Sequence, residues 1–192
     1  MRIIGGTVGG LILKAPKGYD VRPTPDLVRQ ALFNSLGARV VGARVLELFG
    51  GTGALSLESL SRGAASALCL ELSHKHARFI EENFQSTKLP PETFHARLQD
   101  VFSALPQLAA AGTQFDLILA DPPYGEKNVG RRSTSFAQKL LDDGNLPRLL
   151  AAEGLFIVGH TKRDTLTIPP GWQERKAMRH GDSMMRFLGR DA

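Results

Sequence analysis

From Ala43 onward, short apolar runs alternate with segments of helical periodicity, and this alternation restricts the fold more than any other feature of the chain. Alternating strands and helices indicate a doubly wound α/β fold with parallel strands. The last two apolar runs are separated only by a tight turn at Gly181, so the final strand should run antiparallel to its neighbour. We therefore predict a Rossmann-like sheet of seven strands, at residues 43–49, 66–72, 92–98, 115–121, 154–160, 171–180 and 182–189.

Helices are predicted between these strands. The patterns typical of helices follow the strand ends at residues 51–64, 73–86, 100–108, 135–144 and 145–154. In the second of these segments Ser73 is a good N-cap, and Ala77, Ile80 and Phe84 fall on one face. Pro106 should interrupt the third.

Residues 1–37 are predicted to be an N-terminal extension packed on a main domain of residues 38–192. Two short strands around glycine-rich turns indicate a β-hairpin within residues 1–14. In the helix that follows we expect Thr24 as the N-cap, Pro25 at the first helical position and Gly37 as the stop. Its buried stripe should consist of Val28, Leu32 and Leu36.

Composition indicates a globular protein with a weak preference for polyanions. The 192 residues carry a net charge of +5, and 42% of them are hydrophobic. No apolar stretch is long enough to span a membrane, and the first residues do not resemble a signal peptide. Cys69 is the only cysteine and lies in an apolar run, so an inert core thiol and a cytoplasmic address are expected. We expect no metal, no membrane association and no need for more than a monomer.

A glycine-rich turn follows the first strand of the main domain. Gly50, Gly51 and Gly53 allow the backbone to turn sharply, and the next helix points its N-terminus at the same space. About 20 residues later Glu71 ends the second strand, where an acid binds the hydroxyl pair of a ribose. The pattern indicates a nucleoside site, although a purely structural turn is the alternative.

The acid Glu47 precedes these glycines and indicates which ligand the turn binds. A carboxylate there would repel a pyrophosphate but can accept a hydrogen bond from an ammonium group, which favours S-adenosylmethionine over a dinucleotide. The alternative is an acid that caps a neighbouring helix. Asp100 ends the third strand and could accept from an adenine amine beside Val101 and Phe102, or cap its own helix. Phe49 and Leu72, next to the turn and to Glu71, complete the predicted cofactor site.

The fourth strand ends in the motif Asp121-Pro122-Pro123-Tyr124. Two prolines remove backbone donors and fix the chain as a rigid, extended lip. Asp121 and a carbonyl group, for which we choose Pro122, could accept both N–H bonds of a planar amine, while Tyr124 stacks on its ring. The carboxyl ends of parallel strands meet at one edge of the sheet, so we expect Tyr124 to lie close to Gly51. An ordinary loop with a capping acid is the alternative.

Taken together, ELFGGTG and DPPY resemble the S-adenosylmethionine-dependent amino-methyltransferases. With MRIIGG and VRPTPDLVRQALFNSL they are similar to the small bacterial methyltransferases that modify guanine N2 in small-subunit (16S) ribosomal RNA. The resemblance extends from Met1 to about Gly159. It implies a methyltransferase fold, a cytoplasmic enzyme, S-adenosylhomocysteine as product, and 16S rRNA or an assembling small subunit as partner. Departures from the family pattern are mild: Gly50 stands where alanine is frequent, and Tyr124 where phenylalanine is common.

By this resemblance Arg22, Pro23 and Thr24 lie beside the active site. Basic residues at the same sheet edge are candidates for RNA contact, namely Lys127, Arg131, Arg132, Lys162 and Arg163. Other readings stay open: an amino-methyltransferase acting on DNA adenine N6 or on a protein glutamine amide, a nucleotide-binding oxidoreductase, and a ribosome-assembly factor without turnover.

Overall fold

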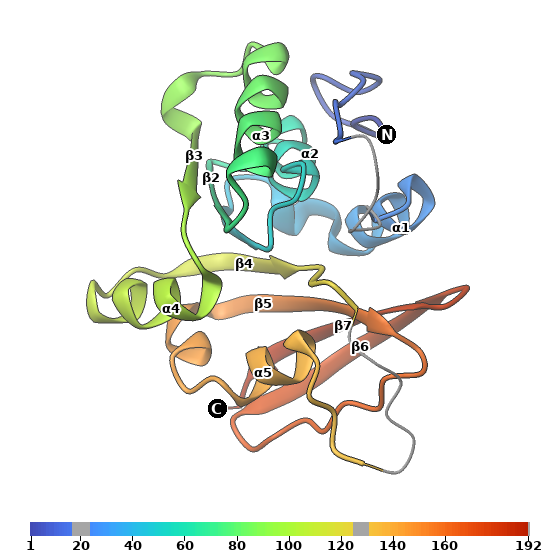
Figure 1. The fold of residues 1–192 in the computed structure, drawn as a ribbon, viewed down its shortest axis with the longest axis vertical. Coiled ribbons are helices and arrows are strands. Elements are labelled where there is room, and N and C mark those ends of the chain that lie inside the picture. The colour runs from blue at the N-terminus through green and yellow to red at the C-terminus, as the bar shows by residue number, and fades with distance from the viewer. Residues whose placement is uncertain (17–23, 125–130, 192) are drawn as a thin grey trace. The chain divides into compact units, whose positions relative to one another are not determined.

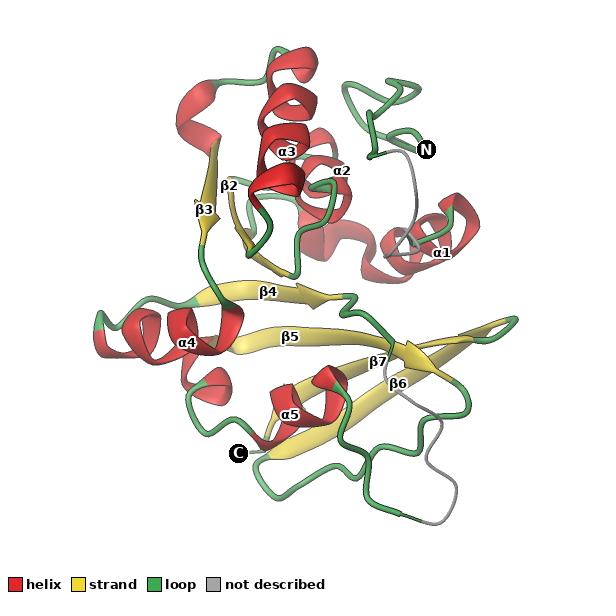
Figure 2. Cartoon of the chain, viewed as in Figure 1, coloured by secondary structure: helices red, strands yellow, loops and turns green. Residues whose placement is uncertain are grey.

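The computed structural model describes residues 1–16, 24–124 and 131–191. The chain divides into two compact units, Met1–Ala104 and Leu105–Ala192. Figure 1 shows the chain coloured by residue number, and Figure 2 shows its helices and strands. The described residues contain seven strands, three in the first unit and four in the second. The predicted boundary between residues 37 and 38 stays a prediction.

The first unit is built on three parallel strands in the order β3-β2-β1. Leu48 at the end of β1 pairs with Leu70, and Glu71 at the end of β2 pairs with Leu98. All three strands therefore finish at the same edge. Two helices accompany them, with α2 packed on β1 and β2, and α3 on β2 and β3 (Figure 2). The elements are β1 (Arg44–Leu48), α2 (Ala54–Ser61), β2 (Ser66–Glu71), α3 (His74–Thr87), a 3-10 turn η2 (Pro91–Thr93) and β3 (Phe94–Leu98).

Residues 1–14 pack against α2. Ile3 and Leu13 form a buried cluster with Ala54 and Leu57, and the carboxylate of Glu58 accepts hydrogen bonds from the backbone N–H groups of residues 4 and 5. The predicted β-hairpin is confirmed as a short antiparallel pairing, since the N–H of Ile3 donates to the carbonyl of Leu11 at 2.9 Å and the N–H of Leu13 to that of Met1 at 3.1 Å. Between them lies the single bridge Arg2↔Ile12. Between the paired ends, the backbone N–H groups of residues 4, 5, 7 and 8 donate to Glu58 and Ser61 of α2.

Helix α1 (Asp26–Leu36) carries the predicted stripe, since Val28, Leu32 and Leu36 are buried. Its start differs from the prediction. Pro25, with φ −57° and ψ 147°, is the extended N-cap, so Thr24 lies outside the helix. Gly37 ends the helix with φ 53°, as expected, and the short helix η1 (Gly37–Val40) follows.

Helix α4 (Val101–Ala110) spans the division between the units and contains Pro106. The predicted interruption was wrong, because the helix continues through the proline. One backbone hydrogen bond is lost at that position, while the apolar side chains of Ala104, Leu105 and Leu108 are buried and stabilise the helix.

The second unit contains four strands in the order β4-β5-β7-β6. β4 and β5 are parallel, whereas β7 runs antiparallel to both β5 and β6, as predicted for the final strand. The indole N–H of Trp172 donates to the carbonyl of Leu141, which ties β6 to helix α5. The elements are β4 (Phe115–Ala120), α5 (Phe136–Asp142), the 3-10 helix η3 (Leu146–Leu149), β5 (Leu150–Thr161), β6 (Trp172–His180) and β7 (Ser183–Arg190).

The helix predicted over residues 145–154 was too long. Only η3 is helical, and β5 begins at Leu150 and runs for 12 residues. Leu149 and Leu150 are fully buried, and pairing of Leu150 with Phe115 extends the sheet into a segment of helical composition. Tertiary pairing therefore overrides the local helical preference. None of the helices in the described ranges combines the length and apolar character that crossing a bilayer needs.

Candidate functional site

In the first unit the predicted cofactor residues gather at the carboxyl edge of β1, β2 and β3. The turn from Phe49 to Gly53 connects β1 to α2, with Gly51 at φ 59° and Gly53 at φ 74°. Glu71 ends β2, and Asp100 follows β3 by two residues. Because parallel strands present their carboxyl ends at one edge, the geometry matches that of a nucleoside site in a doubly wound fold.

Glu71 holds the glycine turn in place. Its Oε2 accepts a hydrogen bond of 2.7 Å from the backbone N–H of Gly51, and its Oε1 accepts one of 2.7 Å from that of Ser73. A carboxylate has about four acceptor positions, so two further bonds, such as those from a ribose diol, are chemically possible. The ribose contact itself stays a prediction.

Glu47 is buried, with 2% of its surface exposed. Its carboxylate accepts hydrogen bonds from the backbone N–H groups of Leu55 and Ser56, so it caps the first turn of α2. Burial raises the pKa of Glu47 to about 7, and the hydrogen bonds from Ser56 and Leu55 oppose that rise. The capping interpretation is therefore confirmed by these bonds, whereas an additional contact to an ammonium group stays a prediction.

Two aromatic rings lie beside the turn. Phe49 has φ 61°, a backbone conformation that bulky residues rarely adopt and that is concentrated at functional sites. Its ring meets that of Phe102 edge to face, with centroids 6.3 Å apart. Leu72, directly after Glu71, is 66% exposed although it is a large apolar residue. These three side chains supply apolar surface at the sheet edge where Glu71 lies.

Asp100 acts as the cap of α4. Its Oδ2 accepts from the backbone N–H and the hydroxyl of Ser103, at 2.9 and 3.1 Å. The neighbouring Val101 is buried. The helix-capping role is thus confirmed, and the proposed contact of Asp100 with an adenine amine stays a prediction.

Gly50 is packed so closely that it has no room for a side chain. A Cβ at this position would lie 2.3 Å from Cys69 Sγ and 3.1 Å from Ile80 Cδ1. Cys69 is fully buried, and burial, together with the nearby Glu47, raises the pKa of its thiol well above the ordinary value. The interpretation of Cys69 as an inert core thiol is confirmed.

In the second unit the motif of Asp121 to Tyr124 forms an extended lip after β4. Ala120 pairs with Val158 on β5, which places Asp121 next to Gly159. A Cβ on Gly159 would lie 2.5 Å from Asp121 Oδ1, so the glycine makes space for the carboxylate. Pro122 is buried, whereas Pro123 is exposed and Tyr124 is 44% exposed. The lip therefore presents an aromatic face to solvent beside a half-buried acid.

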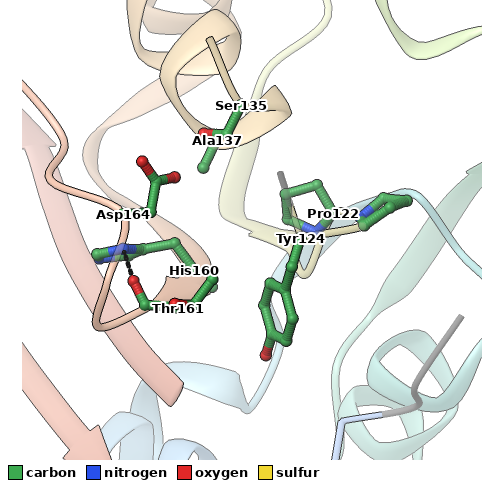
Figure 3. A pocket seen from close by; sticks show the side chains of 9 residues that line it. Pro122, Tyr124, Ser135, Ala137, His160, Thr161 and Asp164 are labelled. Carbon is green, nitrogen blue, oxygen red and sulfur yellow. Dashed lines mark hydrogen bonds between the residues drawn. The ribbon is translucent and has the colours of Figure 1, made fainter. Parts of the chain in front are cut away.

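A pocket opens beside this lip (Figure 3). Pro122 and Tyr124 form one side, and His160, Thr161 and Asp164 face them from the end of β5. The remaining lining residues are Pro123, Ser135, Ala137 and Gly159.

The acid and the base that line this pocket, Asp164 and His160, are both buried. Asp164 is 3% exposed, and its Oδ1 has no hydrogen-bond partner among the described residues. His160 Nε2 accepts from Arg186 Nε at 3.0 Å, and an arginine N–H can only donate, so the imidazole proton is on Nδ1, which donates to the carbonyl of Thr161. Burial, and then the charge of Arg186, lower the pKa of His160, which keeps the ring neutral.

The predicted RNA-contacting residues have mixed outcomes. Arg22, Pro23 and Lys127 lie outside the described residues. Arg131 is exposed, and Arg132 pairs with Asp142 at 2.6 Å. Lys162 and Arg163 are exposed in the turn after β5.

Sequence reasoning did not single out Gly159, His160, Asp164 or Ser183. One signal was available, because a glycine inside an apolar strand often marks the close approach of another group. The distance between Tyr124 and Gly51, which belong to different units, stays a prediction. No cluster of three or more His, Cys, Asp or Glu side chains suited to a metal occurs in the described part of the chain.

Solved structures of known proteins share this fold. The Escherichia coli protein yhhF, described as a candidate methyltransferase, matches with a TM-score of 0.79 and 32% identity over 100% of this chain and 98% of its own. The Thermus protein TTHA0928 matches with a TM-score of 0.79 and 29% identity over 98% of this chain and 99% of its own. More distant likenesses include the Streptococcus mutans methyltransferase candidate SMU.776, solved with S-adenosylhomocysteine bound, at 18% identity. The fold and these structural neighbours define an S-adenosylmethionine-dependent methyltransferase of the Rossmann-like class.

Sequence comparison then gives the family. The chain belongs to the family described as Conserved hypothetical protein 95, whose model matches residues 1–189. The Ribosomal RNA small subunit methyltransferase D of Escherichia coli K12 is 33% identical over 100% of this chain and 91% of its own length. The protein of the same name from Haemophilus influenzae is 31% identical over 90% of this chain and 84% of its own. The resemblance identified from the sequence motifs is confirmed.

Proposed function

We propose that this protein transfers a methyl group from S-adenosylmethionine to the exocyclic N2 amine of a guanine in small-subunit (16S) ribosomal RNA. The observation that carries the proposal is the lip of Asp121 to Tyr124, with its acid seated on Gly159 and its exposed aromatic ring. The relatives named as small-subunit rRNA methyltransferases, matched over 90% of the chain or more, support the choice of substrate.

Residues of the first unit would hold the cofactor. Glu71 would bind the ribose, and the turn from Phe49 to Gly53 would receive the amino-acid end near Glu47. The adenine would lie among apolar side chains next to Asp100. The exposed Leu72 and the Phe49–Phe102 pair supply apolar surface of the kind an adenine ring covers. When bound, S-adenosylmethionine supplies an electrophilic methyl group on a cationic sulfonium.

Residues of the lip would prepare the acceptor. An aromatic amine is a poor nucleophile because its lone pair is delocalised into the ring. Asp121 and the carbonyl of Pro122 accept its two N–H bonds, which pyramidalises the nitrogen and directs the lone pair at the methyl group. Tyr124 stacks on the base, a contact worth about 1–3 kcal/mol. The nitrogen–carbon bond would form as the carbon–sulfur bond breaks and its electron pair stays on sulfur. The proton that the amine loses would pass to the Asp121 carboxylate that accepts its N–H bond. Positioning and electrostatics supply the rate, with no covalent enzyme intermediate.

The Asp121→Ala variant tests this role. Methyl transfer should be lost, since one of the two acceptors is removed, while S-adenosylmethionine affinity stays within several-fold because Asp121 does not hold the cofactor. Single-turnover incorporation of tritiated methyl groups and calorimetry measure the two quantities. Near-normal turnover in the variant would contradict the assignment.

The acceptor class is tested by offering a tritiated methyl donor to ribosomal RNA, DNA and protein from cells that lack the enzyme. We expect label in small-subunit RNA, and mass spectrometry should locate it on guanine N2. Label only in DNA adenine or in a protein glutamine would replace the substrate proposed here. We further propose a cytoplasmic, monomeric enzyme, and sedimentation of the purified protein tests the monomer.

A further inference from the structure

We infer that a cationic rim beside Tyr124 binds the phosphates that flank the target nucleotide, an inference that rests on the proposed function. The rim consists of Lys162 and Arg163, in the turn after β5, and Arg179, at the end of β6, arranged around Asp182 in the β6–β7 turn. Lys162 and Arg163 were predicted from the sequence as RNA contacts, whereas Arg179 and the β6–β7 hairpin were not.

Strand register places this rim at the edge that carries the lip. Ala120, the last residue of β4, pairs with Val158, so β4 and β5 finish at the same edge. Thr161, the last residue of β5, pairs with Ser183 at the start of β7, and Ser183 pairs with His180 at the end of β6. The β6–β7 turn therefore extends from the sheet edge at which Asp121 begins the lip. Figure 1 shows the tip of this hairpin reaching past the end of β5.

Direct contacts join the rim to the lip. The hydroxyl groups of Tyr124 and Ser183 lie 3.3 Å apart, within hydrogen-bond distance. The backbone N–H of Lys162 donates to the carbonyl of Asp182 at 2.8 Å, which ties the turn after β5 to the hairpin. Tyr124 and the rim are therefore neighbours, and these short contacts hold them close together.

The rim carries more positive than negative charge, so it can bind phosphate groups. Lys162 Nζ lies 2.6 Å from Asp182 Oδ1, and this contact, with smaller contributions from Arg163 and Arg179, lowers the pKa of Asp182. Three cations against one carboxylate give a local charge of +2. Neither Arg163 nor Arg179 forms an ion pair with a carboxylate of the described residues, whereas Arg132 pairs with Asp142 and Arg186 with Glu174.

The chemistry of this surface fits single-stranded RNA. Proteins bind single strands by combining basic side chains, which follow the backbone, with aromatic side chains on which bases stack. Here an aromatic ring that is 44% exposed contacts Ser183, the residue that follows Asp182 in the rim. Phosphate contacts fix the register of the strand, and the lip then receives one base.

Charge reversal tests the rim. Arg163→Glu and Arg179→Glu should each raise the KM for small-subunit RNA about three- to tenfold, and the double variant more. For a single strand, each lost phosphate contact should make the slope of log affinity against log salt shallower by about 0.7. The kcat at saturating RNA and the affinity for S-adenosylmethionine should change less than about twofold, since neither arginine belongs to the proposed catalytic groups.

Arg148→Glu is the matched control. This arginine is exposed in η3, at the start of β5, and the 12 residues of β5 separate it from the rim. A strand of that length spans roughly 36 Å. The control should leave the KM and the salt slope unchanged.

These experiments can reject the rim proposal without rejecting the proposed function, and the reverse. If the unaltered enzyme methylates the RNA but the rim variants match Arg148→Glu in KM and salt slope, the rim is wrong and the function stands. If the unaltered enzyme transfers no label to RNA, the proposed function is wrong. Label on a protein acceptor, weakened by the same variants, would show that the rim binds an acidic polypeptide and would overturn the RNA assignment.

Discussion

Asp121 and Gly159 share a space that a methyl group would fill, since a Cβ on Gly159 would lie 2.5 Å from Asp121 Oδ1 and 3.2 Å from its Cγ. The catalytic acid proposed here is thus positioned by a glycine on the neighbouring strand. Gly159 lies within strand β5 and does not have the positive φ that favours glycine. The reason for a glycine at this position is therefore steric: it leaves room for the Asp121 carboxylate.

Gly159→Ala should displace the carboxylate and lower kcat by at least about tenfold, because a small misplacement of a positioning group has a large effect on rate. S-adenosylmethionine affinity should stay close to normal. Gly144→Ala is the control, since nothing lies within 4 Å of a Cβ at that position. Stopped-time methylation assays measure kcat, and equal activity of the two variants would contradict the steric role.

Tyr124 should act through its ring and not through its hydroxyl. Tyr124→Phe keeps the ring and removes the hydroxyl with its contact to Ser183, so kcat/KM should fall less than about threefold. Tyr124→Ala removes the stacking surface and should lower kcat/KM by about tenfold or more. Steady-state kinetics with RNA compares the pair, and an equal loss in both variants would assign the effect to the hydroxyl.

Gly50→Ala should destabilise the first unit. The added methyl group would overlap Cys69 Sγ, and overpacking of a core costs about 1–3 kcal/mol. Replacing Cys69 by alanine in the same protein opens that space, so the double variant should recover much of the lost free energy of unfolding. Denaturant titration of the single and double variants gives the coupling, and purely additive losses would contradict a direct overlap.

Glu47 should make the protein less stable as the pH rises. Its pKa is raised from 4.5 in the unfolded chain to about 7 in the fold, so the folded protein holds the proton more tightly. The stabilisation is complete below about pH 4.5, falls as the pH rises to about 7, and amounts to about 3 kcal/mol. Glu47→Gln cannot titrate and should lack this slope. Urea denaturation across that pH range tests it, and identical slopes for the two proteins would exclude Glu47 as the source.

Much of this architecture could be predicted from residue patterns. The apolar runs placed all seven strands, and the tight turn at Gly181 gave the antiparallel final strand. Local signals were weaker where two preferences compete. Residues 150–153 have helical composition, yet pairing with β4 makes them the start of β5, and buried side chains hold α4 together through Pro106.

The candidate site was predictable only in part. Motifs pointed to Glu47, Glu71 and Asp100, but the backbone groups that each carboxylate contacts depend on the fold. The positive φ of Phe49 could not be predicted from the sequence, because a positive φ is expected at glycine or asparagine and not at phenylalanine. His160, Asp164 and Ser183 come together with the lip through strand register, which a residue pattern alone does not specify.

The burial of Cys69 makes the chain convenient for spectroscopy. Its thiol is inaccessible and resists deprotonation, and it is the only cysteine in the sequence. A cysteine introduced at the exposed Leu72, and another at Pro123, would therefore take up spin labels or fluorophores without a background signal. The distance between these two probes would measure how far the end of β2 lies from the lip after β4.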